Sequence, residues 1–308
     1  MTAVSTKPRL GFLGVGWIGR SRLDAVAASG LAEVAAVADP ALDDAYDTLD
    51  DLLALPLEGI VIATPSALHA EQAVAALEQG VAVFCQKPRG RDAAETRAVV
   101  DAARRADRLL GVDLSYRHVE AFRTARDQLR SGALGELVAA DLVFHNAYGP
   151  DKPWFYDRDL SGGGCVIDLG IHLVDLALWT LGRDGFDTVT SFLHGEPVEQ
   201  HAAAQLDEVR LACSWNLHAG ADAVIGAAFY GTDGAVAVTN VDGSFYDFRC
   251  ERLRGATRET LVEGPDDWGG RAITDWARRL ARDGRFDPAA DELVRVAEVL
   301  DRIYGSTA

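Results

Sequence analysis

The sequence predicts an α/β protein with two domains, first a doubly wound parallel sheet and then an α/β domain with a large, mostly antiparallel sheet. Three observations predict this class. The first third alternates short apolar runs with helical patterns, the part from 187 to about 261 reads as strands broken by turns, and 308 residues are too many for one small core. We place the first domain at 1–114 and the second at 115–285.

The strands of the parallel sheet are expected to be short and apolar, as strands covered on both faces should be. Helical periodicity at 66–79 and 92–107 separates some of them, which indicates βαβ units with right-handed crossovers. The five expected strands are 9–14, 33–38, 59–64, 81–85 and 109–114.

The regular alternation of strand and helix patterns ends at about residue 114. A helix is expected at 119–131, and another at 165–181, which is apolar almost all round and should therefore be buried. The strand-rich part that follows contains Asp-Gly turns typical of hairpins. Two helical segments close the sequence, WGGRAITDWARRLAR and DPAADELVRVAEVLDRIY.

Composition argues against several classes of protein. Lys+Arg 30 against Asp+Glu 47 gives a formal net charge of −17, which repels nucleic acids and acidic membrane surfaces. The N-terminus lacks the apolar core of a signal peptide, and polar residues interrupt segment 165–181, so we expect no membrane span. The cysteines lie far apart without CxxC pairing, which suits buried thiols in a reducing compartment, and we expect a cytoplasmic protein. They are Cys85, Cys165, Cys213 and Cys250.

A glycine-rich stretch, Gly14-Val-Gly16-Trp-Ile-Gly19, follows the first expected strand and opens a helix. Glycine turns are common, so a purely structural turn is the alternative explanation. However, Asp39 stands 20 residues past Gly19 at the end of the second strand, as in the fingerprint of dinucleotide-binding Rossmann domains. Asp39 would accept from the ribose hydroxyls and repel a 2′-phosphate, and no Arg or Lys lies between 38 and 46. We therefore expect NAD, with NADP less favoured.

Lysine is rare in this sequence, which contains only Lys7, Lys87 and Lys152. Lys87 directly follows the fourth expected strand, and ligands of open α/β sheets bind outside the carboxyl ends of the strands. A solvated charge is the ordinary explanation for a lysine at a strand end. Its scarcity, and its place beside the cofactor crevice, favour a functional role for Lys87.

Three polar residues interrupt the apolar helix expected at 165–181. Asp168, His172 and Asp175 fall within roughly 60° of one another on an α-helix that turns about 100° per residue. A solvated stripe would more often carry long Glu, Lys or Arg side chains. A zinc site would want a second His at i+4 or paired Cys, so we expect no metal. Acid–base chemistry fits best, and a satisfied structural cluster is the alternative.

Five motifs stand out together: GVGWIG with Asp39, IATPSALH at 62–69, FCQKP at 84–88, SGALGEL at 131–137 and SGGGCVIDLGIHLVD at 161–175. Jointly they resemble the Gfo/Idh/MocA oxidoreductases. The resemblance implies a Rossmann domain followed by an α/β domain whose open sheet forms oligomer contacts, here of a homodimer or homotetramer. It also implies that the final helix, at 286–308, returns to the Rossmann domain.

The resemblance also assigns residues. The lysine of the family's Glu-Lys-Pro motif corresponds to Lys87, and the aspartate and histidine of its DxGxxxD-like helix correspond to Asp168 and His172; these three are the expected catalytic residues. The expected cofactor contacts are Gly14, Gly16, Trp17, Ile18, Gly19, Asp39, Thr64, Pro65, His69, Gln86 and Lys87. The expected substrate contacts are Tyr116, Arg117, Trp154, Tyr156, Asp168 and His172. Two alternatives stay open: the aromatic residues 154–156 would stack on a sugar ring or merely pack their loop, and His69 is also explained as a structural residue.

This set predicts an NAD-dependent dehydrogenase of a sugar, an inositol or a related cyclic polyol. His172 would remove the hydroxyl proton as hydride leaves for the nicotinamide, since an unperturbed imidazole has a pKa of about 6.5. Asp168 would bind a neighbouring hydroxyl and keep the imidazole poised, Lys87 would stabilise the alkoxide, and Asp175 would orient the ring or make a structural hydrogen bond. The rival functions are an NAD-dependent glycosidase that oxidises its substrate transiently, and a non-catalytic NAD-sensing regulator.

Two features depart from the family pattern. Gln86 replaces the Glu of Glu-Lys-Pro and so removes a negative neighbour that would favour protonated Lys87. Gln86→Glu is therefore expected to move the alkaline limb of the rate profile to higher pH. The segment between Asp39 and the helix expected at 48–53 is also shorter than is usual in the family, which thins the wall around the adenosine.

Overall fold

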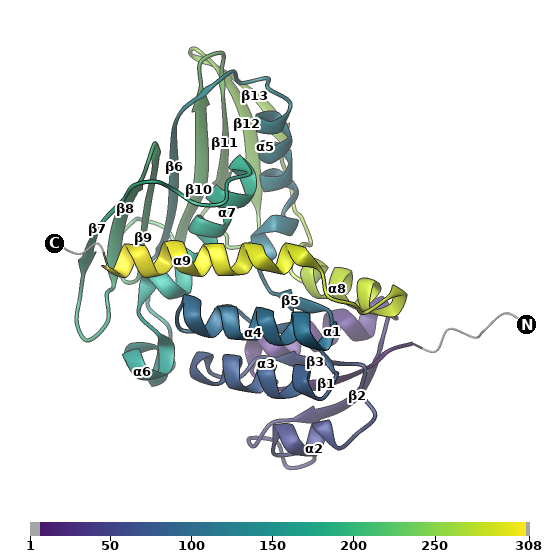
Figure 1. Ribbon diagram of the computed structural model, residues 1–308. Helices are drawn as coiled ribbons and strands as arrows, with labels where there is room; N and C mark the ends of the chain where they lie inside the picture. Colours follow the sequence, from purple (N-terminus) through teal and green to yellow (C-terminus); the bar gives the residue numbers. More distant parts are fainter. Residues whose placement is uncertain (1–6, 306–308) are drawn as a thin grey trace, which may run out of the picture. The chain divides into compact units, whose positions relative to one another are not determined.

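The protein forms two units, each assembled from two separate stretches of sequence (Figure 1). This is a computed structural model that describes residues 7–305. Unit 1 consists of the described residues up to Asp113 together with Gly269–Val294, and unit 2 of Leu114–Trp268 together with the described residues from Arg295 on. An early and a late part of the chain therefore contribute to both.

Unit 1 is built on the expected parallel sheet. Its strand order is β2-β1-β3-β4-β5, and every neighbouring pair is parallel. The order reverses beside β1, which is where such sheets bind their ligands. The strands are β1 Arg9–Leu13, β2 Glu33–Ala38, β3 Gly59–Ile62, β4 Ala82–Cys85 and β5 Leu110–Val112, so all five expected strands are confirmed.

Helices cover both faces of this sheet, as the unbroken apolar strands require. The helices α3 and α4 pack together on one face, and α1 and α8 on the other (Figure 1). A short helix, α2, lies beside β2. Their bounds are α1 Trp17–Ser29, α2 Leu49–Leu53, α3 His69–Glu78, preceded by the turn η1 Ser66–Leu68, α4 Ala93–Ala106 and α8 Arg271–Arg282.

The C-terminal helices divide differently from the expectation that 286–308 returns to the Rossmann domain. Of the C-terminal helices, α8 is the one that packs on the sheet of unit 1. Its Trp276 lies over two strand glycines, since a Cβ at Gly59 or at Gly111 would lie 2.7 Å from the indole. The last helix, α9 Asp291–Gly305, is shared. Its first turn belongs to unit 1, whereas Val299 and Ile303 join the core of unit 2. Residues 306–308 lie outside the described part.

Unit 2 contains an eight-stranded sheet of order β13-β12-β11-β10-β6-β9-β8-β7. Only β6 and β9 pair in parallel, so the expected mostly antiparallel sheet is confirmed. Residues along β6 and β7 alternate in burial, which indicates one packed and one more open face. The strands are β6 Leu137–Asn146, β7 Val189–His194, β8 His201–Leu206, β9 Val209–Ser214, β10 Ala223–Gly231, β11 Ala235–Asn240, β12 Phe248–Arg254 and β13 Thr257–Val262.

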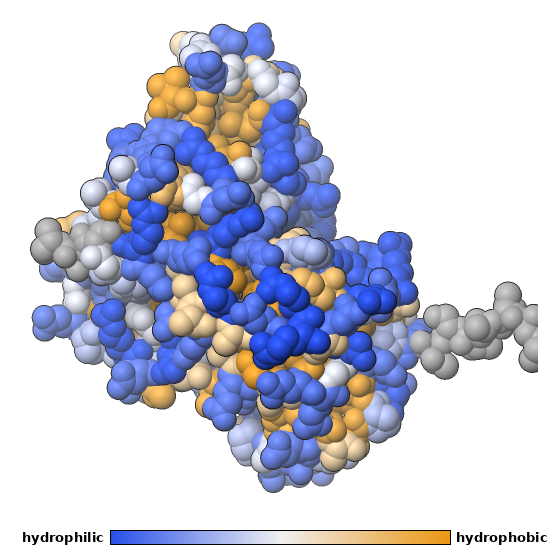
Figure 2. Space-filling view, in the orientation of Figure 1, coloured by the Kyte–Doolittle hydropathy of each residue, from blue (hydrophilic) through white to orange (hydrophobic). Residues whose placement is uncertain are grey.

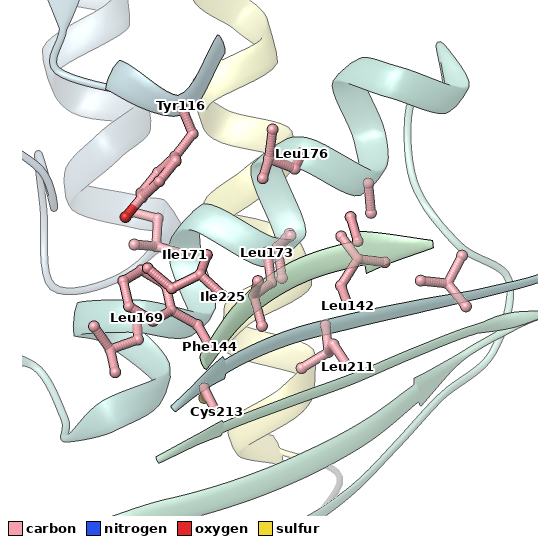
Figure 3. Close-up of a cluster of buried hydrophobic side chains, with 14 of the residues drawn as sticks. Tyr116, Leu142, Phe144, Leu169, Ile171, Leu173, Leu176, Leu211, Cys213 and Ile225 are labelled. Atoms are coloured by element: carbon pink, nitrogen blue, oxygen red, sulfur yellow. The ribbon is translucent and has the colours of Figure 1, made fainter. Parts of the chain in front are cut away.

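The helices of unit 2 pack on the apolar face of the sheet. Figure 3 shows Leu173 on the side of the central helix that faces the strands with Leu142 and Leu211. That helix begins with a π-helical turn, η4 Val166–Gly170, and continues as α7 Ile171–Leu181. The remaining elements are η2 Ser115–His118, α5 Glu120–Arg130, η3 Pro153–Tyr156, α6 Arg158–Ser161 and, in unit 1, η5 Pro288–Ala290.

One stretch, Arg158–Leu181, is long and apolar enough to cross a membrane by length and composition, but 83% of its most apolar window is buried inside the protein. That burial is what the central helix of a folded domain shows. The four cysteines are buried and free, with Cys165 Sγ and Cys213 Sγ 3.8 Å apart. The surface drawn in Figure 2 is mostly hydrophilic, with hydrophobic residues gathered over strands of unit 2 beside α5.

Candidate functional site

The glycine-rich stretch forms the tight loop between β1 and α1, and each glycine has a distinct place. Gly14 has a φ of +82°, which favours glycine, and its N–H donates to the Ala38 carbonyl at 2.8 Å. A Cβ at Gly19 would lie 2.2 Å from the Gly14 carbonyl oxygen, so only glycine brings the helix this close to the strand. A Cβ at Gly16 would meet nothing within 4 Å. The backbone at Gly16 is thus open to a ligand, as a pyrophosphate cradle requires.

Asp39 is fixed at the end of β2 by backbone donors. The Val15 N–H donates to its Oδ2 at 2.8 Å and the Ala41 N–H to its Oδ1 at 3.0 Å. A cavity of about 340 Å³ opens beside Val15 and is lined by Val15, Arg20, Leu23, Val37, Leu42, Asp43, Asp44 and Ala45. Trp17, at the start of α1, is 77% exposed. The cation Arg20 was missed from the sequence, because it reaches this cavity from α1 rather than from the segment after Asp39.

His69 at the start of α3 connects two loops at the carboxyl edge of the sheet. Its Nδ1 lies 2.6 Å from the Pro88 carbonyl oxygen and its Nε2 lies 2.7 Å from that of Thr64. Burial lowers the pKa of this imidazole, although the two hydrogen bonds oppose the shift. A neutral imidazole has one N–H, so His69 donates to one of the two carbonyls while its other nitrogen lies against the second.

Lys87 follows β4 directly, is half-buried, and stands between two anchored residues. Pro88 is held by His69. On the other side, the Gln86 Nε2 donates to Asp113 Oδ2 at 2.5 Å. The same oxygen accepts from Arg22 Nε of α1, also at 2.5 Å. Sequence reasoning found Gln86 and Lys87 but missed Asp113 and Arg22, which lie 27 and 64 positions from Gln86.

Arg89, two residues beyond Lys87, is only 3% exposed. Among the described residues its Nε and Nη1 find no hydrogen-bond partner. Burial lowers the pKa of this guanidinium to about 10. A buried cation with unmet donors is costly in free energy.

In unit 2, Asp168 lies in the π-helical turn η4 rather than on a regular α-helix. Its Oδ2 accepts from the indole Nε1 of Trp215 at 3.1 Å. Trp215 follows β9 and was not singled out from the sequence, since it lies 47 residues away. Asp168 thus lies in a π-helical turn that runs directly into α7, the helix that carries His172 and Asp175.

His172 is 8% exposed and stands against aromatic rings. Its ring centroid lies 4.9 Å from that of Tyr116 in an edge-on arrangement, and 6.1 Å from that of Phe144. Figure 3 shows the Tyr116 ring reaching from η2 toward the start of this helix, near Ile171. Burial raises the pKa of the Tyr116 hydroxyl. Tyr116 therefore forms a wall beside His172 as part of an aromatic core.

Asp175 pairs with Arg117. Arg117 Nε lies 3.0 Å from both carboxylate oxygens and its Nη2 lies 2.6 Å from Oδ1, while the Asp175 side chain is 2% exposed. This fork-to-carboxylate contact links η2 to α7. Asp175 was expected either to orient the His172 ring or to make a structural hydrogen bond. The structure shows a structural partner, because the Arg117 guanidinium pairs with the Asp175 carboxylate.

The aromatic loop packs on Trp215. Trp154 and Phe155 stack with centroids 3.8 Å apart, and the Tyr156 ring lies 5.6 Å from that of Trp215. The three rings of the loop are partly exposed. Through Trp215 the loop is joined to Asp168, so a carboxylate and an apolar ring surface stand side by side, as binding of a sugar ring requires.

A buried carboxylate caps the start of this helix. Glu199 Oε1 accepts from the N–H groups of Gly164 and Val166 at 2.8 and 3.0 Å, and from the Tyr304 hydroxyl of α9 at 2.7 Å. A Cβ at Gly164 would lie 1.9 Å from the Glu199 carbonyl oxygen. The glycine run before the helix is explained by this close approach. Among the described residues no group of three or more His, Cys, Asp and Glu could hold a metal ion.

Two family descriptions match the chain. "Oxidoreductase family, NAD-binding Rossmann fold" matches residues 9–114, and "GFO/IDH/MocA C-terminal domain" matches residues 122–242. The chain belongs to the Gfo/Idh/MocA oxidoreductase family. The expected membership and the sequence-predicted fold are both confirmed.

Curated members of the Gfo/Idh/MocA family align over part of their length. Rhizopine catabolism protein MocA from Rhizobium meliloti is 32% identical over 58% of this chain and 59% of its own. D-glucoside 3-dehydrogenase from Escherichia coli is 30% identical over 51% of this chain and 45% of its own. Inositol 2-dehydrogenase from Streptomyces avermitilis is 28% identical over 85% of this chain and 88% of its own. The chain thus spans about half the length of the first two relatives.

Solved structures of other proteins share this fold. Levoglucosan dehydrogenase in complex with NADH has a TM-score of 0.83 at 19% identity, covering 98% of this chain and 97% of that one. KijD10, a 3-ketoreductase from Actinomadura kijaniata in complex with NADP and TDP-benzene, has a TM-score of 0.86 at 21% identity, covering 98% of each chain. At these identities the likeness establishes the architecture alone.

Proposed function

We propose that this member of the Gfo/Idh/MocA family is an NAD-dependent dehydrogenase that transfers hydride between a nicotinamide and a hydroxyl of a sugar, an inositol or a related cyclic polyol. The observation that carries the proposal is the contact of Trp215 with Asp168, which joins a hydroxyl-binding carboxylate to an aromatic loop one helical turn from His172. Relatives that act on glucosides and inositol support this class of substrate.

The residues of unit 1 fit a dinucleotide. Gly16 leaves open backbone at the start of α1, where helix N–H groups favour an anion. The Asp39 carboxylate, fixed by two backbone donors beside the 340 Å³ cavity, would accept from the ribose hydroxyls of the adenosine. Its charge opposes a 2′-phosphate, which favours NAD over NADP. When bound, the nicotinamide supplies a carbon that accepts or returns hydride.

Residues of the protein would remove the proton of the reacting hydroxyl and stabilise the charge that develops on its oxygen. His172 takes the proton of the reacting hydroxyl as general base, in surroundings where Tyr116 and Phe144 exclude water from one side. Asp168, oriented by Trp215, accepts a hydrogen bond from a neighbouring hydroxyl and fixes the ring. Lys87 stabilises the negative charge that develops on the oxygen. Lys87 belongs to unit 1, and His172 and Asp168 belong to unit 2.

A panel of polyols, sugars and sugar phosphates with NAD tests this function. Steady formation of NADH with at least one cyclic polyol or sugar is expected, and His172→Ala and Lys87→Ala should each lower turnover by about 10² or more while NAD binding changes little. Hydrolysis of a glycoside without net formation of NADH would indicate the NAD-dependent glycosidase instead. NAD binding without turnover on the whole panel would indicate a regulator.

We further propose that the protein is cytoplasmic and that it associates as a homodimer or homotetramer through the more open face of the unit 2 sheet. On that face Val143 of β6 pairs with Ala212 of β9 and Gly226 of β10. Small and apolar residues in the middle of a large sheet give a flat surface that a second copy can cover.

A further inference from the structure

The Gln86 side chain lies in a buried cluster with one acid and one base. Gln86, Asp113 and Arg22 are 7%, 2% and 6% exposed. Gln86 Nε2 and Arg22 Nε both donate to Asp113 Oδ2 at 2.5 Å. The charges of Arg22 and Asp113 balance, and the amide adds none. A carboxylate in this position accepts short, charge-assisted hydrogen bonds that are stronger than neutral ones.

Glutamate cannot replace Gln86 here without a penalty. An acid at 86 would bring a second carboxylate oxygen to about the same distance from Asp113 Oδ2, in a site almost closed to water. Two like charges so close in a poorly solvated site are strongly unfavourable. The departure from Glu-Lys-Pro therefore has a local cause, because the carboxylate next to the lysine segment is supplied by Asp113 instead.

Asp113 is also tied to the same segment through the backbone. The Asp113 N–H donates to the Cys85 carbonyl at 3.0 Å, and the Gln86 N–H donates to the Ile62 carbonyl at 2.9 Å. Arg22 extends the connection to α1, the helix that begins with the glycine-rich loop. One carboxylate thus links the end of β4, the end of β5 and the expected cofactor helix immediately before Lys87.

We propose that Asp113 is a positioning residue for Lys87, and that the amide and the carboxylate at positions 86 and 113 can be exchanged, because Asp113 supplies here the carboxylate that the Glu of Glu-Lys-Pro would supply at position 86. Asp113 acts through the Gln86 side chain and keeps the lysine aimed at the reacting oxygen, while Arg22 keeps the carboxylate ionised and in place. This role presupposes that Lys87 has the function proposed above.

A four-member cycle of wild type, Gln86→Glu, Asp113→Asn and the combined variant tests the exchange. Each single change should lower kcat by about tenfold or more and lower the thermal midpoint, while the combination returns kcat to within about threefold of wild type. Rates are measured with NAD and the most active polyol of the panel. The matched control is Gln79→Glu, which adds the same charge at an exposed position of unit 1 and should change neither quantity.

A second readout follows Lys87 itself without turnover. The chain has three lysines, so acetylation by acetic anhydride can be followed at each by mass spectrometry, with the exposed Lys152 as the internal reference. The rate at Lys87 relative to Lys152 should change by about threefold or more in Asp113→Asn and return in the combined variant. An Asp113 that merely stabilises the fold would leave this ratio unchanged in folded protein.

Adding the Lys87→Ala change separates this inference from the proposed function. If Asp113 acts through the lysine, Asp113→Asn should reduce kcat no further, within about twofold, once Lys87 is absent. A slow Lys87→Ala enzyme in which Asp113→Asn still lowers kcat tenfold would overturn the positioning role alone. Wild-type turnover of Lys87→Ala would overturn the function proposed for the lysine and this role with it. If Asp113→Asn does not fold, the combined variant decides: low kcat and an altered acetylation ratio in folded protein reject the exchange.

Discussion

At the scale of single residues, Asp39 is the acid that we propose binds the ribose, and the protein itself fixes its orientation. Its carboxylate accepts from Val15 and Ala41 N–H groups, so its orientation is set by the backbone of the two loops it joins. Arg20 lines the cavity beside Val15 and brings a positive charge that a 2′-phosphate would use. We therefore expect the choice between NAD and NADP to depend on the balance between Asp39 and Arg20.

Replacing Asp39 should shift that balance. Asp39→Ala is expected to weaken NAD binding by about tenfold and to narrow the preference over NADP, since ribose acceptors and the repulsion of a 2′-phosphate are lost together. Calorimetric titration of both cofactors measures this. The matched double variant, Asp39→Ala with Arg20→Met, should bind NADP more weakly than Asp39→Ala does, and it should bind NAD with the same affinity as Asp39→Ala. Equal affinities in the wild type would refute the assignment of NAD.

Trp215 gives a second prediction for a single residue. Trp215→Phe keeps an aromatic ring under Tyr156 but removes the N–H that donates to Asp168, so kcat/KM should fall by about tenfold. Trp179→Phe, in α7, removes a different indole and serves as the control. An unchanged kcat/KM in Trp215→Phe would mean that the carboxylate needs no orienting donor.

These residues also show what sequence could reveal. Gly14, Gly16, Gly19 and Asp39 were found because their spacing is local and each has a conformational or chemical reason. Trp215 was not found, because it meets Asp168 only through the pairing of distant strands. Glu199 and Tyr304 escaped notice for the same reason, since they lie 105 residues apart and neither belongs to a motif.

At the scale of elements, the helix at 165–181 was predicted but not its internal geometry. Apolar periodicity identifies a buried helix, yet an α-helix and a π turn have nearly the same apolar pattern over five residues. The turn Val166–Gly170 separates Asp168 from α7, where His172 and Asp175 lie. The contacts of the three residues include an indole at Asp168, an aromatic ring at His172 and a guanidinium at Asp175. Such turns often mark functional positions in helices.

The beginning of this helix should be intolerant of even one methyl group. Gly164→Ala would place a Cβ 1.9 Å from the Glu199 carbonyl oxygen, and we expect a loss of about 3 kcal/mol in the free energy of unfolding. Urea denaturation measures it. Gly185→Ala is the control, because a Cβ there meets nothing within 4 Å. Equal stability of the two variants would show that the Gly164 backbone can move away without cost.

At the scale of the whole molecule, the sheet of unit 2 is expected to join copies of the chain. Val143→Arg places a charge at the centre of the more open face and should convert the proposed oligomer into monomers, because a buried unpaired charge is strongly unfavourable. Sedimentation velocity measures the change, with Gln79→Arg as the control on unit 1. A monomeric wild type would rule out association through this face.

Both units include residues from the C-terminal part of the chain, and this affects how the protein folds during synthesis on the ribosome. The sheet of unit 1 is covered by α8, whose Trp276 ring lies 5.7 Å from that of Phe84, and the Glu199 cap in unit 2 receives its phenol from Tyr304. Neither core is complete until nearly the whole chain has been synthesised. A nascent chain that ends at Asp113 would expose the apolar surface meant for α8, so we expect the fragment 1–113 to aggregate when expressed alone. Supplying residues 269–294 by a short linker after Asp113 should restore a soluble, cooperatively unfolding domain, as judged by circular dichroism on heating.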